Sequence, residues 1–223
     1  MIEIVLPTLR SHYAELLDQM FRMRYDICIK KWGWVVPNQK PGLDIDEFDN
    51  DEAVYMLLLS DDRQDVIGCC RFNPTTSPYM ISKLWPESCD LQAPPSDPAI
   101  WEASRFVVRG GMGSKEKYLE IMWRLSTGMC EFCVSAGIEK IVWYTDPPFY
   151  QTIASVMDTE PLGRPTYNVD DDKTYISGTS KPNEDGIRRS RANLKDPGMN
   201  LTFALTPLGQ PQLLFPFNQK KAA

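Results

Sequence analysis

Histidine is nearly absent from this chain of 223 residues, in which His12 is the single example. One histidine removes most Ser-His-Asp, Cys-His and His-ligated metal schemes. His12 itself falls early in the first expected helix, where a surface position is the simplest interpretation. Any chemistry must therefore come from carboxylates, arginines, backbone groups or the reactivity of the substrate.

The chain also lacks long apolar runs and an excess of positive charge. No stretch approaches the ~20 apolar residues that a membrane-spanning helix requires. The first residues lack the basic segment of a signal peptide, so we expect a cytoplasmic protein. The formal net charge is −6, which argues against nucleic acid as a general partner.

Zinc-type cysteine spacing is missing as well, although the chain has six cysteines. Cys130 and Cys133 have C-x-x-C spacing, but they fall late in an expected helix, and no second Cys or His pair lies nearby. Buried free thiols are the simpler interpretation of these residues, and a redox pair is the alternative.

The composition is that of a globular protein, with 43% hydrophobic and 24% charged residues. We expect a single domain over 1–223, in which 163–198 is an exposed polar excursion and 218–223 is a tail. The periodicities predict strands at 1–6, 53–60, 66–72, 100–108, 139–145 and 200–206, and helices from about 9 to 30 and at 81–85, 115–136 and 149–157. Strand, helix and strand over 100–145 predict a parallel βαβ unit, and hence an α/β fold.

The stretch 100–108, Ile-Trp-Glu-Ala-Ser-Arg-Phe-Val-Val, is the centre of the functional argument. Glu102 and Arg105 are costly to bury in so apolar a strand unless they are paired or used. In a regular strand they point to opposite faces, with Ser104 and Phe106 on the face of Glu102, although a bulge would change this. Other charges in apolar settings are Arg24, Asp44, Asp46, Asp49 and Arg71. We expect all of these charges to meet in one cleft.

Two of these features have ordinary alternatives. Arg24 continues the apolar stripe of the first helix, so it is either a surface residue with a buried stem or a ligand in a cleft. The acids at 44–49 lie in a connection over 35–52, which is either a solvated acidic loop or a functional one. Periodicity and loop composition alone leave these alternatives open.

With these residues in place, the chain resembles the LuxI-type acyl-homoserine-lactone synthases across residues 20–110. The family's signature is an arginine, a tryptophan, two loop aspartates, a strand arginine and an E-x-S-R-like strand. In order, these correspond to Arg24, Trp34, Asp46, Asp49, Arg71, Glu102 and Arg105. The turn Pro-Leu-Gly-Arg-Pro at 161–165 is similar to the family's later L-G-x-P turn, and the last third of the chain matches weakly.

The resemblance implies a three-layer fold like that of N-acetyltransferases, with a mixed, twisted sheet, helices on both faces, and strands splayed to admit an acyl chain. It implies an acyltransferase that makes N-acyl-homoserine lactone, a quorum-sensing signal, from S-adenosylmethionine and an acyl thioester. The amine attacks the thioester, and the methionyl carboxylate then displaces methylthioadenosine. Because the sulfonium supplies its own leaving group, neither a metal nor another cofactor is expected.

The resemblance also suggests roles for the charged residues. The catalytic candidates are Glu102, Arg24, Asp46, Asp49, Arg71 and Arg105. Glu102, directly or through a water, is the expected base for the amine. The aspartates balance positive charge or hold the loop, and one of the arginines grips the substrate carboxylate. The alternative is that these charges tie one another into a rigid network.

A second group of residues is expected to contact the substrates. These candidates are Trp34, Asp44, Ser104, Phe106, Trp101, Met122, Trp143 and Thr145. Trp101, Met122 and Trp143 are either walls of an apolar acyl pocket between 100–108 and 139–145 or ordinary core residues. Thr145 aligns with a threonine of family members that take 3-oxo chains.

The chain departs from the family pattern in two places. The family usually has phenylalanine where this chain has Cys28, which affects packing around the nucleotide substrate. The basic residues that help family members to dock acyl carrier protein are absent, because nothing between Lys140 and Arg164 is cationic. Either another basic patch serves, at Lys115 and Lys117 or at 188–191, or the acyl donor is coenzyme A.

Two other functions compete with this one. A CoA-dependent N-acetyltransferase of the same fold is favoured by Gly110, Gly111 and Gly113, because a glycine-rich turn before a helix holds a phosphate in some proteins and only relieves crowding in others. A non-catalytic module that binds a nucleotide or acyl ligand is the third possibility. Release of methylthioadenosine distinguishes the lactone synthase from both.

Overall fold

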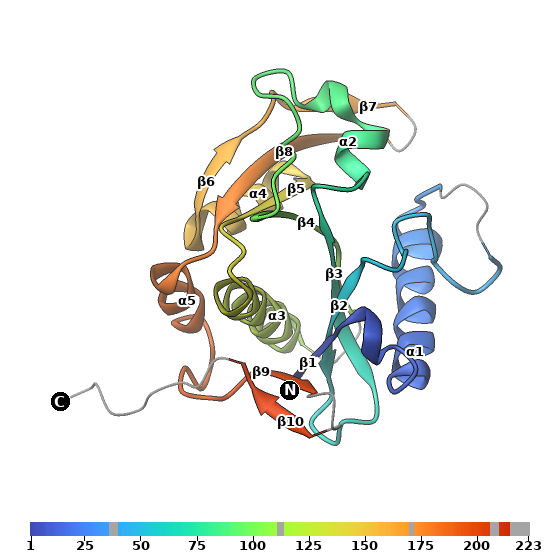
Figure 1. Cartoon of the computed structure of the whole chain (residues 1–223), viewed down its shortest axis with the longest axis vertical. Helices are drawn as coiled ribbons and strands as arrows, with labels where there is room; N and C mark the ends of the chain where they lie inside the picture. The colour runs from blue at the N-terminus through green and yellow to red at the C-terminus, as the bar shows by residue number, and fades with distance from the viewer. Residues whose placement is uncertain (36–39, 111–113, 170–171, 206–209, 215–223) are drawn as a thin grey trace.

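The chain folds around one mixed β-sheet, shown in Figure 1. The computed structural model describes residues 1–35, 40–110, 114–169, 172–205 and 210–214. The strands are β1 (Ile2–Val5), β2 (Val54–Leu59), β3 (Val66–Pro74), β4 (Ile100–Val108), β5 (Lys140–Thr145), β6 (Asp158–Pro161), β7 (Thr166–Asn168), β8 (Lys173–Lys181), β9 (Thr202–Leu205) and β10 (Pro211–Leu213). Their order is β10-β9-β1-β2-β3-β4-β5-β8-β6, with β7 beside β8.

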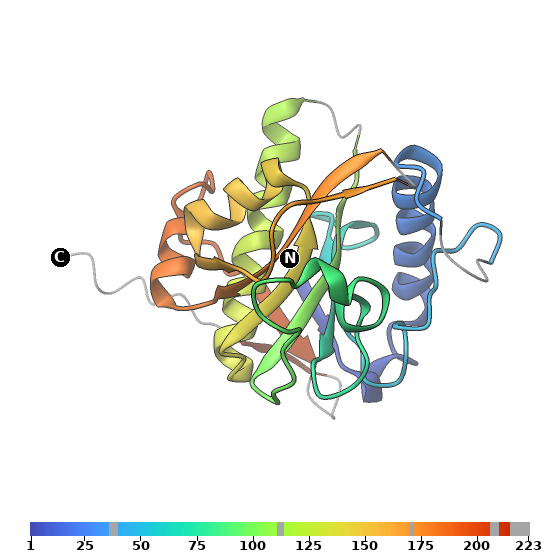
Figure 2. The ribbon, with the colours of Figure 1, turned by 90° about the horizontal axis from the view of Figure 1, so that it is seen from above.

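Helices cover both faces of this sheet, as Figures 1 and 2 show. The helical elements are η1 (Pro7–Leu9), α1 (Ala14–Arg24), the π-helix η2 (Tyr25–Lys31), α2 (Met80–Leu84), η3 (Pro86–Ser88), α3 (Lys115–Ala136), α4 (Pro147–Val156) and α5 (Glu184–Arg191). In Figure 1, α1 lies on one side of β2 and β3, and α3, α4 and α5 lie on the other. This is the three-layer arrangement that the sequence predicts.

The central strand β2 shows why the sheet needs helices on both faces. Met56 and Leu58 belong to the core on the α3 side, whereas Tyr55 and Leu57 belong to the core on the α1 side. Alternate residues of a strand point to opposite faces, so a strand covered on both sides is apolar throughout. The near-continuous apolar run that predicts this strand therefore also reflects its central position.

Helix α3 is bounded by local capping signals. The hydroxyl of Ser114 accepts a hydrogen bond from the backbone N–H of Lys117 at 3.3 Å, and Gly137 ends the helix with φ +71°. Such an N-cap and a left-handed glycine at the C-terminus are typical helix limits. Of the glycine-rich turn before α3, Gly111 and Gly113 lie outside the described residues.

The strands β4 and β5 form the predicted parallel pair, but only over part of their length. The ladder joins 100–102 to 140–142 and does not continue along 103–108. Helix α3 forms the crossover between the two strands, as Figure 1 shows. Beyond Glu102, β4 and β5 are therefore no longer paired with each other.

A β-bulge interrupts β4 at Arg105. The register with β3 changes between Cys69, which faces Val107, and Arg71, which faces Ser104. The strand β4 thus carries one extra residue, and Arg105 has φ +52°. A bulge reverses the side-chain alternation beyond it. Arg105 consequently points to the same side as Glu102, which is the exception that the sequence argument left open for a bulged strand.

The polar segment 163–198 is not an exposed excursion, so this prediction is wrong. It contains β8, which pairs with β5, β6 and β7, and residues 175–180 of β8 are buried. Helix α5 follows, and it buries Arg191 against Glu131 of α3. The prediction failed because the serine, threonine and glycine residues of β8 are buried, and the charged residues of this strand lie only at its ends. The predicted tail at 218–223 lies outside the described residues.

Candidate active site

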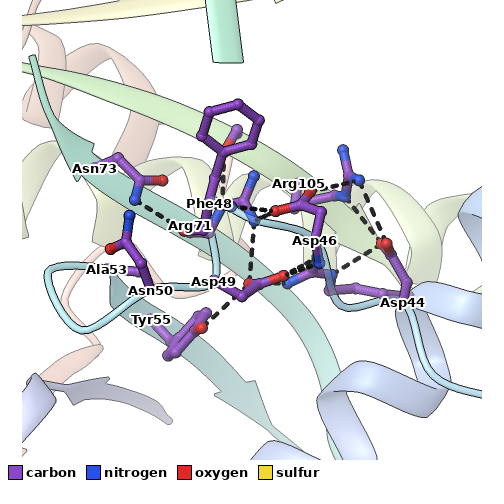
Figure 3. Close-up of polar contacts among 12 residues, drawn as sticks. Asp44, Asp46, Phe48, Asp49, Asn50, Ala53, Tyr55, Arg71, Asn73 and Arg105 are labelled. Carbon is purple, nitrogen blue, oxygen red and sulfur yellow. Dashed lines mark hydrogen bonds and ion pairs between the residues drawn. The ribbon is translucent and has the colours of Figure 1, made fainter. Parts of the chain in front are cut away.

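The predicted charges do meet, in a network of three arginines and three aspartates. The acids come from the loop between η2 and β2, and Figure 3 shows them against the arginines of β3 and β4. Arg24, at the end of α1, is fully buried. Its Nε donates to Asp44 at 3.0 Å, and its two terminal nitrogens donate to Asp49 at 2.8 and 3.0 Å. The continuation of the apolar helix stripe by Arg24 thus reflects burial in this network.

The two strand arginines complete the network. Arg71 donates to Asp46 at 2.5 Å and lies 3.1 Å from Asp49, and its Nε donates to the hydroxyl of Ser104 at 3.1 Å. Arg105 donates to Asp44 at 2.9 Å and to Asp46 at 2.8 Å. Three guanidinium groups thus balance three carboxylates, and this satisfies the condition for burying charge.

The network also fixes the protonation of its acids. Burial by itself raises the pKa of Asp49, but the charges of Arg71 and Arg24 outweigh burial and hold that pKa well below its usual range. Burial acts in the same way on Asp44, and the charges of Arg24 and Arg105 lower its pKa in turn. Both carboxylates therefore stay ionised at neutral pH.

Glu102 lies beside the network but has a different environment. It is 1% exposed, and its two carboxylate oxygens accept backbone N–H bonds from Met80 at 3.1 Å and Ile81 at 3.0 Å, at the start of α2. Burial raises the pKa of Glu102 to about 7, although the hydrogen bond from Ile81 and the charge of Arg71 lower it. A carboxyl group with this pKa can gain and lose a proton near neutral pH, which suits a general base.

A cavity of ≈ 590 Å³ opens in front of Glu102. It is lined by Gly33, Trp34, Val35, Ile45, Asp46, Glu47, Phe48, Met80, Ile81, Leu84, Trp85, Glu102, Ala103, Ser104, Arg105, Tyr144, Asn168 and Tyr175. Its volume is in the range of small-molecule sites. Because it combines a charged end with apolar and aromatic walls, it suits a ligand that has both ionic and apolar parts.

Aromatic rings form much of the wall of this cavity. Trp85 stacks on Tyr144 with ring centroids 4.8 Å apart, and Tyr144 stacks on Tyr175 at 4.9 Å. Elsewhere in the lining, the guanidinium of Arg105 lies 5.2 Å from the centre of the Trp34 ring. Trp34 and Arg105 therefore form a cation–π pair in the wall of the cavity.

The predicted site residues fall into three groups. Those that line the cavity are Trp34, Asp46, Ser104, Glu102 and Arg105. Those that support it from behind, within the network, are Arg24, Asp44, Asp49 and Arg71. Those outside its lining are Trp101, Phe106, Met122, Trp143 and Thr145, the first four of which belong to or pack against the core on the α3 side.

Some of the residues that build the site gave no signal in the sequence. The sulfur of Met80 accepts from Arg71 at 3.0 Å, and the backbone N–H of Phe48 donates to Asp46 at 2.9 Å. The hydroxyl of Tyr55 donates to Asp49 at 3.1 Å. These residues are apolar or aromatic, so a search for charges in apolar settings passes over them. Met80 and Phe48 can be recognised as site residues only from the fold, which places them against the arginines.

A second cavity, of ≈ 850 Å³, lies at the far end of β4, by the start of α3. Its lining includes the basic residues Arg22, Lys31, Arg109 and Lys115. The acids in its lining already have partners, since Asp26 lies 2.8 Å from Lys30 and Asp65 lies 4.0 Å from Arg109. Positive charge and the N-terminus of a 22-residue helix together favour an anion there.

The cysteines follow the simpler of the two predictions. All six are free and buried, including Cys130 and Cys133 of the C-x-x-C spacing. Cys28 lies in η2 within the core on the α1 side, and burial raises its pKa to about 12. Within the described ranges, no group of His, Cys, Asp and Glu is arranged to hold a metal ion, and no helix is long and apolar enough to cross a membrane.

The fold has the three-layer α/β architecture of N-acetyltransferase-like proteins. A putative N-acetyltransferase from Lactobacillus plantarum shares the fold alone, with a TM-score of 0.50 and 12% identity over 82% of this chain and 98% of that one. The similarity is higher to a CoA-dependent acyl-homoserine lactone synthase, BjaI, whose structure holds SAM and isopentyl-CoA. There the TM-score is 0.81 with 26% identity, over 93% of this chain and 94% of that one.

Sequence comparison identifies the family. The autoinducer synthase family matches residues 8–161. The isovaleryl-homoserine lactone synthase of Bradyrhizobium diazoefficiens is 33% identical over 170 residues, which cover 74% of this chain and 73% of that protein. The chain therefore belongs to the autoinducer synthase family, and it is an acyl-homoserine-lactone synthase. The family, fold and enzyme class that the sequence predicts are confirmed.

Proposed function

We propose that this enzyme makes its lactone from S-adenosylmethionine and a short acyl group carried by coenzyme A, with Glu102 as the base. The observation that carries the proposal is the position of Glu102, buried at the edge of the ≈ 590 Å³ cavity beside a neutralised ionic network. Its pKa of about 7 suits proton transfer from an amine near neutral pH.

The residues that line the cavity suit the charges of S-adenosylmethionine. Arg105 is the one network arginine among the lining residues, so it grips the substrate carboxylate. Asp46 and Glu47 face the same space and attract the ammonium and sulfonium groups. Arg24 and Arg71 act indirectly, because their hydrogen bonds with the loop acids hold Asp46 and Asp49 in place.

The reaction then needs only the two substrates and the side chains of the site. Glu102 removes a proton from the ammonium, and the free amine attacks the thioester carbon and expels the thiolate. The methionyl carboxylate next displaces methylthioadenosine from the γ-carbon and closes the lactone. We propose that no cofactor takes part, because the sulfonium is already a good leaving group and the thioester is already activated.

Coenzyme A is the favoured acyl donor for two reasons. Helix α4 has the sequence Pro-Pro-Phe-Tyr-Gln-Thr-Ile-Ala-Ser-Val, so it offers no positive charge to an acidic carrier protein. The ≈ 850 Å³ cavity does offer positive charge, from Lys31, Arg109 and Lys115 around the start of α3. The diphosphate of coenzyme A fits that chemistry. The likeness to the CoA-dependent BjaI supports the same donor.

The gap between β4 and β5 limits the length of the acyl group. Phe106 of β4 contacts Phe149 of α4 with ring centroids 5.2 Å apart, and Trp143 of β5 contacts Tyr150 at 5.4 Å. These four rings belong to or pack against the core on the α3 side of the sheet, and we propose that they close the end of the acyl site, so that a short acyl group fits and a long one does not. The predicted preference of Thr145 for 3-oxo chains remains a prediction, and comparing Thr145→Ala with the unchanged enzyme on both chain types tests it.

A two-donor assay tests the proposed function. The purified chain is given S-adenosylmethionine with isovaleryl-CoA or with the same acyl group on acyl carrier protein, and methylthioadenosine and the lactone are measured by mass spectrometry. We expect both products from the CoA donor, at a kcat/KM at least tenfold above that for the carrier protein. Preference for the carrier protein contradicts the proposed donor. Thioester consumption without methylthioadenosine contradicts the proposed reaction.

A further inference from the structure

Asn73 of β3 is a buried polar side chain with one unused hydrogen-bonding atom. It is 1% exposed, and its Nδ2 donates to the backbone oxygen of Phe48 at 2.9 Å. That contact fixes which end of the amide carries the oxygen, because a carbonyl only accepts. The Oδ1 atom is also buried, and it has no hydrogen-bond partner in the described part of the chain. Buried acceptors normally have partners, so this atom requires an explanation.

The position of Asn73 in the sheet supplies one. In the antiparallel β3–β4 ladder, Asn73 is directly opposite Glu102. Opposite residues of such a pair share one face, with Cβ atoms about 5 Å apart. The same face carries Arg71 and Ser104, which are opposite each other two residues along the strands and are hydrogen-bonded. The amide of Asn73 and the carboxyl group of Glu102 are therefore immediate neighbours on the site face of the sheet.

We propose that Oδ1 of Asn73 is the acceptor for the proton that Glu102 takes from the substrate amine. Asn73 is then a positioning residue, because it acts through Glu102 and is not itself among the cavity-lining residues. The inference rests on the proposed role of Glu102. The hydrogen bond to Asn73 explains how the buried carboxyl group of Glu102 can hold a proton and keep its orientation.

The proton balance is simple. The substrate ammonium gives one proton to Glu102, which becomes a neutral acid and donates that proton to Asn73 in a hydrogen bond. The amine forms its bond to the thioester carbon, the C–S bond breaks, and the thiolate takes the second amine proton to leave as a thiol. The two backbone N–H bonds from Met80 and Ile81 hold the carboxyl group throughout. Release of the proton from Glu102 to solvent completes the cycle.

Other charged and titratable groups near Glu102 do not provide this acceptor. Arg71 and Asp46 act on it through their charges, and Arg71 has only donors. Asp46 is already held by Arg71 and Arg105. From neighbouring elements, the carboxyl group also acts on Tyr79 and Cys70, and burial keeps both of these protonated near neutral pH. Asn73 is the neutral acceptor directly across the ladder.

A matched pair of substitutions isolates the oxygen atom. Asn73→Thr and Asn73→Val both remove the amide, and they differ in that threonine has a hydroxyl group, whose oxygen can accept, where valine has a methyl group. We expect the acid limb of the pH profile of kcat/KM to stay in place in the threonine variant. In the valine variant it moves down by about one pH unit, because a hydrogen bond to the protonated form is lost. The valine variant also loses several-fold in kcat, while its KM for S-adenosylmethionine is unchanged.

Two controls separate this role from a structural one. Tyr55→Phe removes a hydrogen bond to Asp49 of the same acidic loop without touching Glu102, so its acid limb should not move. If the variants turn over too slowly, an infrared titration follows the protonated carboxyl band that Glu102→Gln abolishes, and that band must show the same shift. Superimposed profiles for the threonine and valine variants overturn the inference. Full turnover by Glu102→Gln instead overturns the proposed function, so the two failures are distinguishable.

Discussion

Arg105 and Asp44 are joined by two hydrogen bonds, at 2.9 and 3.3 Å, although 61 residues separate them. Arg105 makes this contact from a left-handed backbone conformation, with φ +52°. That conformation costs about 1–2 kcal/mol outside glycine, and a buried two-point ion pair offsets it. The strained bulge of β4 and the acidic loop therefore hold each other in place, and together they set the charged end of the cavity.

Breaking this network should destabilise the whole domain. Asp49→Asn removes one charge and leaves Arg24 and Arg71 partly uncompensated, so we expect a loss of about 3–5 kcal/mol in the free energy of unfolding. Urea denaturation at pH 7 measures it. Asp18→Asn is the matched control, because Asp18 pairs with Arg22 on an exposed helix surface and should contribute under about 1 kcal/mol. Equal effects of the two substitutions would show that the buried network carries no special stability.

The same network predicts how acid unfolds the protein. The arginine charges outweigh burial and lower the pKa of Asp44 and Asp49 in the folded state. The unfolded chain therefore binds protons before the folded one, and the stabilisation present above pH ~4 is lost as pH falls below it. Urea midpoints between pH 7 and pH 3 test this. Asp49→Asn should show a shallower loss over that window, and parallel curves would contradict the assignment.

The effect of Glu102 on stability changes with pH in the opposite direction. Its pKa rises from 4.5 to about 7 on folding, chiefly through burial. Between these values the unfolded state has lost the proton that the folded state keeps, so the penalty to folding grows with pH and then becomes constant. Glu102→Gln removes the penalty, and its stability relative to the unchanged enzyme should rise by up to about 3 kcal/mol between pH 4.5 and 7. A pH-independent difference in urea denaturation would contradict the raised pKa.

The proposed position of the coenzyme A diphosphate can be tested on one helix. Lys115 lines the ≈ 850 Å³ cavity, whereas Lys117 of the same first turn does not. Lys115→Gln should raise the KM for isovaleryl-CoA about tenfold, as expected for one lost phosphate contact. Lys117→Gln should change it less than twofold. Steady-state kinetics with saturating S-adenosylmethionine provide the values, and equal effects would place the diphosphate elsewhere.

Acyl length should depend on the rings between β4 and β5. Phe149→Ala removes the partner of Phe106 and should raise the kcat/KM for octanoyl-CoA about tenfold relative to isovaleryl-CoA, because added methylenes then find apolar surface. Phe203→Ala is the control, since Phe203 is also half-buried but lies in β9, four strands away from β4. If the proposed preference for short chains is unchanged by Phe149→Ala, these rings do not limit the acyl group.

The sequence was informative where burial and charge conflict. An arginine on an apolar helix stripe, acids within the long connection 35–52 and two charges in one apolar strand together predict pairing, because unpaired charges are too costly to bury. The near-continuous apolar runs likewise located the central strands. Both arguments depend only on the free energy of burying particular side chains, so they could be applied before the fold was known.

Other features depend on tertiary structure and were not predictable in this way. The bulge at Arg105 is a backbone event that leaves no residue-type signal, and it alone decides which face the guanidinium meets. The strand β8 is polar because its serines bond to partners such as Trp143, whose indole donates to Ser180 at 2.9 Å. The composition of β8 is therefore similar to that of an exposed segment. Asn73 was passed over because an asparagine in a strand carries no charge to explain.

The central claim is that Glu102 deprotonates the amine in the cavity beside the arginine–aspartate network. The most direct measurement is the release of coenzyme A and methylthioadenosine by the unchanged enzyme and by Glu102→Gln, from S-adenosylmethionine and isovaleryl-CoA, with folding checked by circular dichroism. We predict equimolar release by the unchanged enzyme, and a fall of at least a hundredfold in both products for a normally folded Glu102→Gln. Release of both products at the unchanged rate by that variant would contradict the account.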